Sequence, residues 1–270
     1  AQAISVMTRT EFVFLPGSPF SLRAKWMMSL CGVPPEKKHA FIAMLSELPL
    51  RCRLGLRPWT AAFWRRITVP ILIVHEGGAA LTITDSFDIA CWAARQPSAL
   101  PLQLFPDETK LRHWNSISDV LLSFFRVKLL DAAWNDPSLG ADFTPPALRG
   151  IPFLSSLLIR IGLLGFGFKY SREAQASTEG KAMAALEEVR SALQSGEYLL
   201  DGKLSYADIT VAVALDTLSL RPGAMKTSDV RLRFASECFG GLNAQYADVM
   251  QWKDKFIAKH FPADMRPNRA

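Results

Sequence analysis

The sequence has no paired cysteines and no dense block of positive charge. Its four cysteines are scattered over 270 residues, with no C-x-x-C motif and no cysteine–histidine spacing typical of a zinc site. These absences argue against a disulfide framework and a metal centre, and they favour a reducing, cytoplasmic compartment. The net charge of +6 is dispersed along the chain, so we expect no nucleic-acid partner.

Long uncharged runs are also scarce. The stretch 151–168 reads IPFLSSLLIRIGLLGFGF, and Arg160 is its one charged residue. A spanning helix needs about 20 apolar residues, and the glycines at the end of this stretch weaken a continuous helix. We therefore expect a buried helix followed by a loop here, with a peripheral membrane contact as the alternative. The first ten residues hold no apolar run of the kind found in a secretory signal.

The first hundred residues alternate strand patterns with helix patterns. Apolar runs bounded by turn residues predict strands, and N-cap residues ahead of periodic apolar positions predict helices. The resulting order is strand, helix, strand, helix, strand, strand, helix, which one small mixed sheet of the thioredoxin-like type satisfies. The predicted strands are 11–15, about 38–44, 68–74 and, after a Gly77-Gly78 turn, 81–86; the predicted helices are 19–31, about 59–66 and 87–95.

After a proline-rich linker at 98–107, the chain is predicted to be helical throughout. Apolar residues recur at helical spacing over 111–134. Ser205 and Asp208 have the spacing of a capping box, and the apolar run that follows predicts a buried central helix. The length and the hydrophobic content of 49% suit two domains. The predicted domains are an α/β domain at 10–97 and an all-helical domain at 107–262.

Ser18 stands at a helix start that can bind an anion. It precedes Pro19, and this is the preferred pair for an N-cap and a first helical position. A helix N-terminus presents unpaired N–H groups and the positive end of the dipole, so it stabilises an anion such as a thiolate. A serine hydroxyl there can donate a hydrogen bond to the thiolate and lower its pKa. The alternative is that Ser18 only caps its helix.

Two further features point to recognition of a small peptide. Pro70 lies at the start of a strand, where a proline removes a ladder donor, and such an X-Pro bond is a candidate for the cis form. A cis bond would leave the backbone of Val69 free to pair with an extended peptide; an ordinary edge-strand proline is the alternative. Asp85 and Ser86 form either a simple N-cap or a site where the serine holds a carboxylate and the aspartate meets an ammonium group.

Three segments of the sequence, taken in their order along the chain, resemble glutathione transferases with a serine-type active site. SPFSLRAKWMMSLCGVP resembles the first helix of that family, TVPILIV…LTITDSFDIACWAA its proline-bearing strand and acid–serine helix, and GEYLLDGKLSYADITVAVAL its C-terminal capping motif. The resemblance implies the glutathione transferase fold, glutathione as co-substrate and a homodimer. The long region 136–170 loosely resembles the bacterial and fungal transferases related to beta-etherases.

The resemblance also implies a role for individual residues. Ser18 corresponds to the serine that stabilises the thiolate, and Val69 corresponds to the backbone anchor. The basic stretch has no clear match in the family, and one of its arginines is expected to bind the glycine carboxylate: Arg51, Arg53, Arg57, Arg65 or Arg66, with Arg66 as the candidate. Asp208 corresponds to a folding residue. The implied glutathione site consists of Ser18, Phe20, Arg66, Val69, Pro70, Asp85 and Ser86.

The expected activity is conjugation of the glutathione thiolate to an electrophilic apolar compound, as in detoxification. The acceptor site is expected in the cleft between the domains. Its candidate lining is Phe20, Trp114, Ile117, Leu121 and the apolar stretch near 163–168, for which ordinary core packing is the alternative. A serine at position 18 argues against thiol-transferase chemistry, which needs a cysteine there. Two other functions stay open: a non-catalytic carrier of hydrophobic ligands, and a glutathione-dependent lyase or isomerase such as a beta-etherase.

Overall fold

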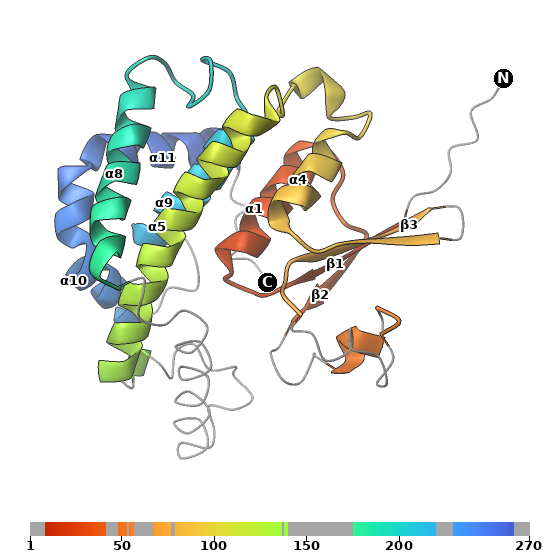
Figure 1. Cartoon of the computed structure of the whole chain (residues 1–270), viewed down its shortest axis with the longest axis horizontal. Helices are drawn as coiled ribbons and strands as arrows, with labels where there is room; N and C mark the ends of the chain where they lie inside the picture. Colours follow the sequence, from red (N-terminus) through yellow and green to blue (C-terminus); the bar gives the residue numbers. More distant parts are fainter. Residues whose placement is uncertain are drawn as a thin grey trace. The chain divides into compact units, whose positions relative to one another are not determined.

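The chain divides into two compact units, Ala1–Pro106 and Asp107–Ala270. The first unit combines a sheet with helices and the second is helical (Figure 1), so the predicted fold class is confirmed. The computed structural model describes residues 9–41, 48–52, 54–56, 67–76, 79–136, 138–139, 175–219 and 229–261. Three predicted features lie outside these residues: the helix near 59–66, the Gly77-Gly78 turn and the apolar stretch 151–168.

The first unit is built on a four-stranded mixed sheet in the order β2-β1-β3-β4. β2 runs parallel to β1, whereas β3 is antiparallel to both β1 and β4. The first four residues of β3, Ile71 to Val74, are all buried, as expected for a strand covered on both faces. The strands are β1 (Arg9–Phe14), β2 (Lys37–Ala40), β3 (Ile71–Glu76) and β4 (Ala79–Ile83).

The predicted strands are confirmed in order and type, but their ends differ. The strand predicted over 68–74 begins at Ile71, directly after Pro70, because a proline nitrogen has no hydrogen to donate to the ladder. The strand predicted near 38–44 ends at Ala40 among the described residues, since 42–47 lie outside them. Turn residues in the sequence thus predict that a strand is present more reliably than they predict the residue at which it ends.

Two helices cover one face of this sheet (Figure 1), and they pack against each other. α1 (Pro19–Leu30) and α4 (Ser86–Ala94) begin and end within one residue of the predicted helices. Gly32 closes α1 with a φ of +70°, a conformation that glycine adopts without the steric cost of a Cβ. The opposite face carries an apolar cluster of Val13, Leu50, Ile71 and Ile73.

The second unit is organised around one completely buried helix. α9 has thirteen residues and all of them are buried, in agreement with the predicted central helix. It packs against α5 and α11, and the Ser118 hydroxyl of α5 donates to the Thr210 carbonyl of α9 at 2.8 Å. The helices are α5 (Glu108–Asn135), α8 (Gln175–Leu193), α9 (Tyr206–Leu218), α10 (Asp229–Gln245) and α11 (Ala247–His260). None of the described helices is long and apolar enough to cross a membrane.

The predicted capping box is present at the start of α9. The Asp208 carboxylate is fully buried and accepts hydrogen bonds from the backbone N–H groups of Leu199 and Ser205, both at 2.8 Å. The Ser205 hydroxyl donates to the same carboxylate at 3.1 Å. Burial raises the pKa of Asp208 to about 6, against the opposing effect of these hydrogen bonds. Asp208 thus ties the preceding turn to the central helix.

We predict that Asp208→Ala lowers the free energy of unfolding by about 2–4 kcal/mol, because it leaves two buried N–H groups without an acceptor. Urea denaturation followed by circular dichroism measures the loss. Ser205→Ala removes a hydroxyl but leaves the carboxylate in place, so it should cost about 1 kcal/mol. Equal losses in the two variants would contradict this account of the box.

Candidate glutathione site

Three of the predicted segments lie at the same end of the sheet. β1 runs toward Ser18, and the antiparallel pairing of Val13 with Ile71 brings the start of β3 beside the end of β1. The last residue of β4, Ile83, pairs with Leu72, so the chain enters α4 from this end too. The starts of α1, β3 and α4 are therefore gathered at one edge of the first unit.

Ser18 is the N-cap of α1, but its hydroxyl does not cap the helix. Its backbone is extended, with φ −74° and ψ 124°, and its side chain makes no capping hydrogen bond. The Ser18 N–H donates to the Leu15 carbonyl at 3.0 Å, and the Ser21 hydroxyl accepts from the Leu15 N–H at 3.2 Å, which fixes the turn. Within the described part of the chain, the Ser18 hydroxyl has no partner. No hydrogen bond therefore supports the alternative that the Ser18 hydroxyl only caps the helix. The hydroxyl is available to a ligand.

The Val69–Pro70 peptide bond is cis, as predicted. Pro70 is buried, and the Val69 side chain packs against the apolar cluster on the sheet. Among the described residues, no hydrogen bond engages the Val69 backbone, since the ladder begins at Ile71. A backbone N–H and a C=O are therefore available here for strand-like pairing. The assignment of this pair to glutathione stays a prediction.

Asp85 is the N-cap of α4 and uses one carboxylate oxygen for it. Its Oδ1 accepts from the backbone N–H groups of Phe87 at 2.8 Å and Asp88 at 3.4 Å. The residue is exposed, and no other group of the described chain engages its Oδ2. The two interpretations left open by the sequence are thus compatible, because one oxygen caps the helix and the other remains available to a cation.

Ser86 has a buried partner, Arg23, that no sequence motif indicates. Its hydroxyl accepts a hydrogen bond from Nε of Arg23 at 2.9 Å, and both residues are only 2% exposed. The Arg23 guanidinium also lies over the Phe20 ring, 4.6 Å from its centroid. Because the hydroxyl oxygen accepts from Arg23, its own hydrogen stays available to donate. The signal in the sequence is an arginine inside the buried stretch of the first helix, where an unpaired charge would be costly.

Residues 17–96 match the family described as glutathione S-transferase, N-terminal domain. The N-terminal domain belongs to the glutathione S-transferase family. The match runs from the turn before α1 to the end of α4, so it contains every segment of the candidate site. It confirms the predicted resemblance to glutathione transferases, whereas the serine-type active site and the link to the beta-etherase relatives stay predictions. Among curated proteins, no sequence matches the chain.

Solved structures extend the likeness to the whole chain. Glutathione S-transferase Xi from Phanerochaete chrysosporium superposes with a TM-score of 0.55 at 14% identity, covering 97% of this chain and 81% of that one. Maleylacetoacetate isomerase from Anaeromyxobacter dehalogenans, with bound glutathione, gives 0.52 at 16% identity and covers 98% of both chains. A glutathione S-transferase from Methylobacterium radiotolerans, in complex with glutathione sulfonate, gives 0.52 at 14% identity, covering 97% and 96%. At these identities the likeness shows the glutathione S-transferase fold.

The structure places the other predicted site residues differently. Phe20 is half-buried beneath Arg23, whereas Arg66 lies outside the described residues. The three side chains of α5 that are expected to line the acceptor site are all buried: Trp114 is 6% exposed, Ile117 5% and Leu121 0%. Such burial agrees with the core-packing alternative, and an acceptor role for these three residues stays a prediction.

The Cys31 thiol lies at the far end of α1 from Ser18. Cys31 follows the last residue of α1, and burial raises the pKa of its thiol to about 12. It therefore stays protonated and packs as a small apolar side chain. Within the described ranges, no three metal-ligating side chains are grouped so that they could hold a metal ion.

We predict that Ser86→Ala lowers the free energy of unfolding by about 1–3 kcal/mol, because it removes an acceptor from the buried Arg23 guanidinium. Urea denaturation measures the change. Ser195→Ala is the matched control: its hydroxyl donates to the Ala192 carbonyl in an exposed turn, so its effect should stay within about 0.5 kcal/mol. If the two variants are equally stable, the Arg23–Ser86 hydrogen bond does not hold α1 and α4 together.

Proposed function

We propose that this protein binds glutathione and transfers its thiolate to an electrophilic apolar compound. The observation that carries the proposal is the gathering of the starts of α1, β3 and α4 at one edge of a glutathione S-transferase domain. Two helix N-termini and an unpaired backbone segment together suit a peptide that has carboxylates, an ammonium group and a thiol.

The tripeptide would be held by its backbone and by its γ-glutamyl end. The free N–H and C=O of Val69 pair with the cysteinyl backbone of glutathione. The N-terminus of α4 and the Ser86 hydroxyl receive the γ-glutamyl carboxylate. Asp85, through its unused oxygen, meets the ammonium group. The buried charge of Arg23 supports this arrangement, because it fixes Ser86 and adds positive potential behind the carboxylate.

The thiol would be activated at the start of α1. The Ser18 hydroxyl donates to the thiolate, and the helix dipole adds to the stabilisation. A hydrogen bond to a charged acceptor contributes about 1.5–3 kcal/mol. Since one pKa unit corresponds to about 1.36 kcal/mol, this bond lowers the thiol pKa by about one to two units. The rest of the catalysis is positioning of the two reactants.

The proposal includes a partner and a location. A homodimer in the cytoplasm, with an apolar electrophile as second substrate, is what the family resemblance implies. A glutathione-dependent isomerase is the second candidate, favoured by the similar fold of a maleylacetoacetate isomerase that binds glutathione. The two differ in stoichiometry, because conjugation consumes one glutathione per turnover whereas isomerisation regenerates it. Following free thiol during turnover separates them.

We predict that Asp85→Asn weakens glutathione binding by about 5-fold, because exposed ion pairs contribute up to about 1 kcal/mol. Asparagine keeps the N-cap, so the helix start is preserved. Isothermal titration calorimetry with glutathione measures the dissociation constant. Asp107→Asn is the matched control, since Asp107 caps α5 with the same pair of backbone hydrogen bonds. Absence of glutathione binding to the wild type would refute the proposed function itself.

We predict that Ser18→Ala raises the pKa of bound glutathione by about one unit or more. Turnover of an activated aryl halide at neutral pH should fall about 10-fold or more for the same reason, while the fold is retained. Thiolate absorbance in a pH titration of the complex gives the pKa without knowledge of the natural acceptor. Ser18→Thr keeps the hydroxyl and should recover most of the shift. If Ser18→Ala changes neither the thiol pKa of bound glutathione nor the turnover, Ser18 does not stabilise the thiolate.

A further inference from the structure

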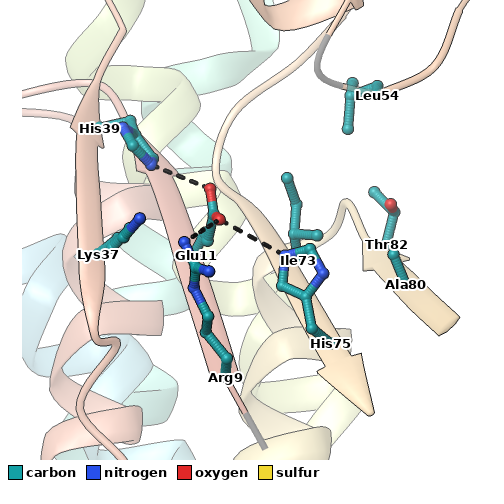
Figure 2. Close-up of a pocket in the computed structure, with 9 residues that line it drawn as sticks. All are labelled: Arg9, Glu11, Lys37, His39, Leu54, Ile73, His75, Ala80 and Thr82. Carbon is teal, nitrogen blue, oxygen red and sulfur yellow. Dashed lines mark hydrogen bonds and ion pairs between the residues drawn. The ribbon is translucent and has the colours of Figure 1, made fainter. Parts of the chain in front are cut away.

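The first unit has a polar pocket on the face of the sheet that carries the Val13–Leu50–Ile71–Ile73 cluster (Figure 2). Its volume is about 340 Å³, which is the size range of sites for small molecules. None of its lining residues belongs to the proposed glutathione site. They are Arg9, Glu11, Lys37, His39, Leu54, Ile73, His75, Ala80 and Thr82.

The strand register explains why these side chains meet. Side chains alternate between the faces of a strand, so Arg9 and Glu11 share the face that also carries Val13. Arg9 is opposite His75 of β3, and Glu11 is opposite Lys37 of β2. Three neighbouring strands thus contribute polar side chains to one patch of a face that is otherwise apolar around Val13 and Ile71.

Glu11 is the centre of this patch. Its side chain is 12% exposed, and its Oε2 lies 3.1 Å from Nε2 of His39. Its Oε1 lies 3.4 Å from Nη2 of Arg9 and 3.5 Å from Nε2 of His75. Figure 2 shows the two imidazoles approaching the carboxylate from opposite sides. The carboxylate therefore holds three nitrogen-bearing side chains around the pocket.

The fixed charges of the pocket do not cancel. Arg9 and Lys37 are positive, Glu11 is negative, and the two histidines can only add positive charge. Lys37 has no hydrogen-bond or ion-pair partner within the described part of the chain, although it lies in the pocket. A cationic group without a partner, in a hollow with an excess of positive charge, attracts an anion.

Apart from Thr82, the remaining lining residues are apolar. Ile73 of β3, Ala80 of β4 and Leu54 contribute this apolar surface. An inorganic ion alone would leave this apolar surface in contact with water. A ligand that has an anionic head and a short apolar body would satisfy both walls.

We propose that this pocket binds a small organic anion with a carboxylate or phosphate head. The head lies at the Lys37 ammonium, within reach of the nitrogen-bearing side chains that Glu11 holds. The apolar body lies on Leu54, Ile73 and Ala80. The site is independent of the proposed glutathione function, because it uses a different set of residues on the same sheet.

The experiment is isothermal titration calorimetry of the full chain with benzoate, phenyl phosphate and benzamide, in the absence of glutathione. Benzoate and benzamide have nearly the same shape and differ in charge. We expect at least one of the two anions to bind and benzamide not to bind detectably. The tighter anion identifies a carboxylate or a phosphate as the preferred head.

Two variants locate the binding, with a matched control. Lys37→Gln removes one positive charge from the pocket and should weaken anion binding by about 5-fold. Lys38→Gln removes the same charge from the next residue of β2, which pairs with Phe12 and points to the other face, so it should have no effect. Ala80→Phe places a larger side chain on the apolar side of the pocket without a change of charge, so it should also weaken binding. Circular dichroism confirms that each variant is folded.

Three results would each overturn the proposal. The first is failure of both anions to bind the wild type, and the second is equal binding of benzamide and benzoate. The third is binding that neither Lys37→Gln nor Ala80→Phe weakens, since the anion would then lie elsewhere. Glutathione binding is measured separately, so loss of the proposed function leaves this test intact.

Discussion

The antiparallel pairing of β1 with β3 is the constraint on which the first unit depends. It sets Val13 against Ile71 and so places the end of one strand beside the start of the other. The two segments are more than fifty residues apart in the chain, and no local preference would bring them together. A shift of register by one residue would turn every side chain of β3 to the wrong face and move the Val69 backbone away from Ser18. The candidate site is thus a product of strand register.

In the proposed function, helix N-termini supply most of the chemistry at that edge. α1 and α4 both begin there, and each leaves N–H groups that an anion can use. The two helices are also held together by Arg23, which reaches from α1 to Ser86 at the start of α4. A buried guanidinium is costly unless it is hydrogen-bonded. Arg23 therefore both joins the two helices and adds a positive charge next to the candidate site.

The sequence predicted several local backbone features better than it predicted the strand ends. Ser18-Pro19, Val69-Pro70 and the Ser205–Asp208 box are local signals, because each depends on a residue type with one strong conformational preference. Arg23 and Glu11 could not be found in this way. Arg23 meets its partner 63 residues away, and Glu11 gathers its partners from two other strands. Contacts of this kind follow from register and packing, which a single sequence does not contain.

The burial of α9 on every side has a consequence for how this protein can vary. A helix with a solvent-facing stripe can accept substitutions on that stripe at little cost, but α9 has no such stripe over its thirteen residues. Nearly every change there would open a cavity or force an overlap in a closely packed interior. Among the described helices of the second unit, those around α9 should therefore accept substitutions more readily than α9 itself.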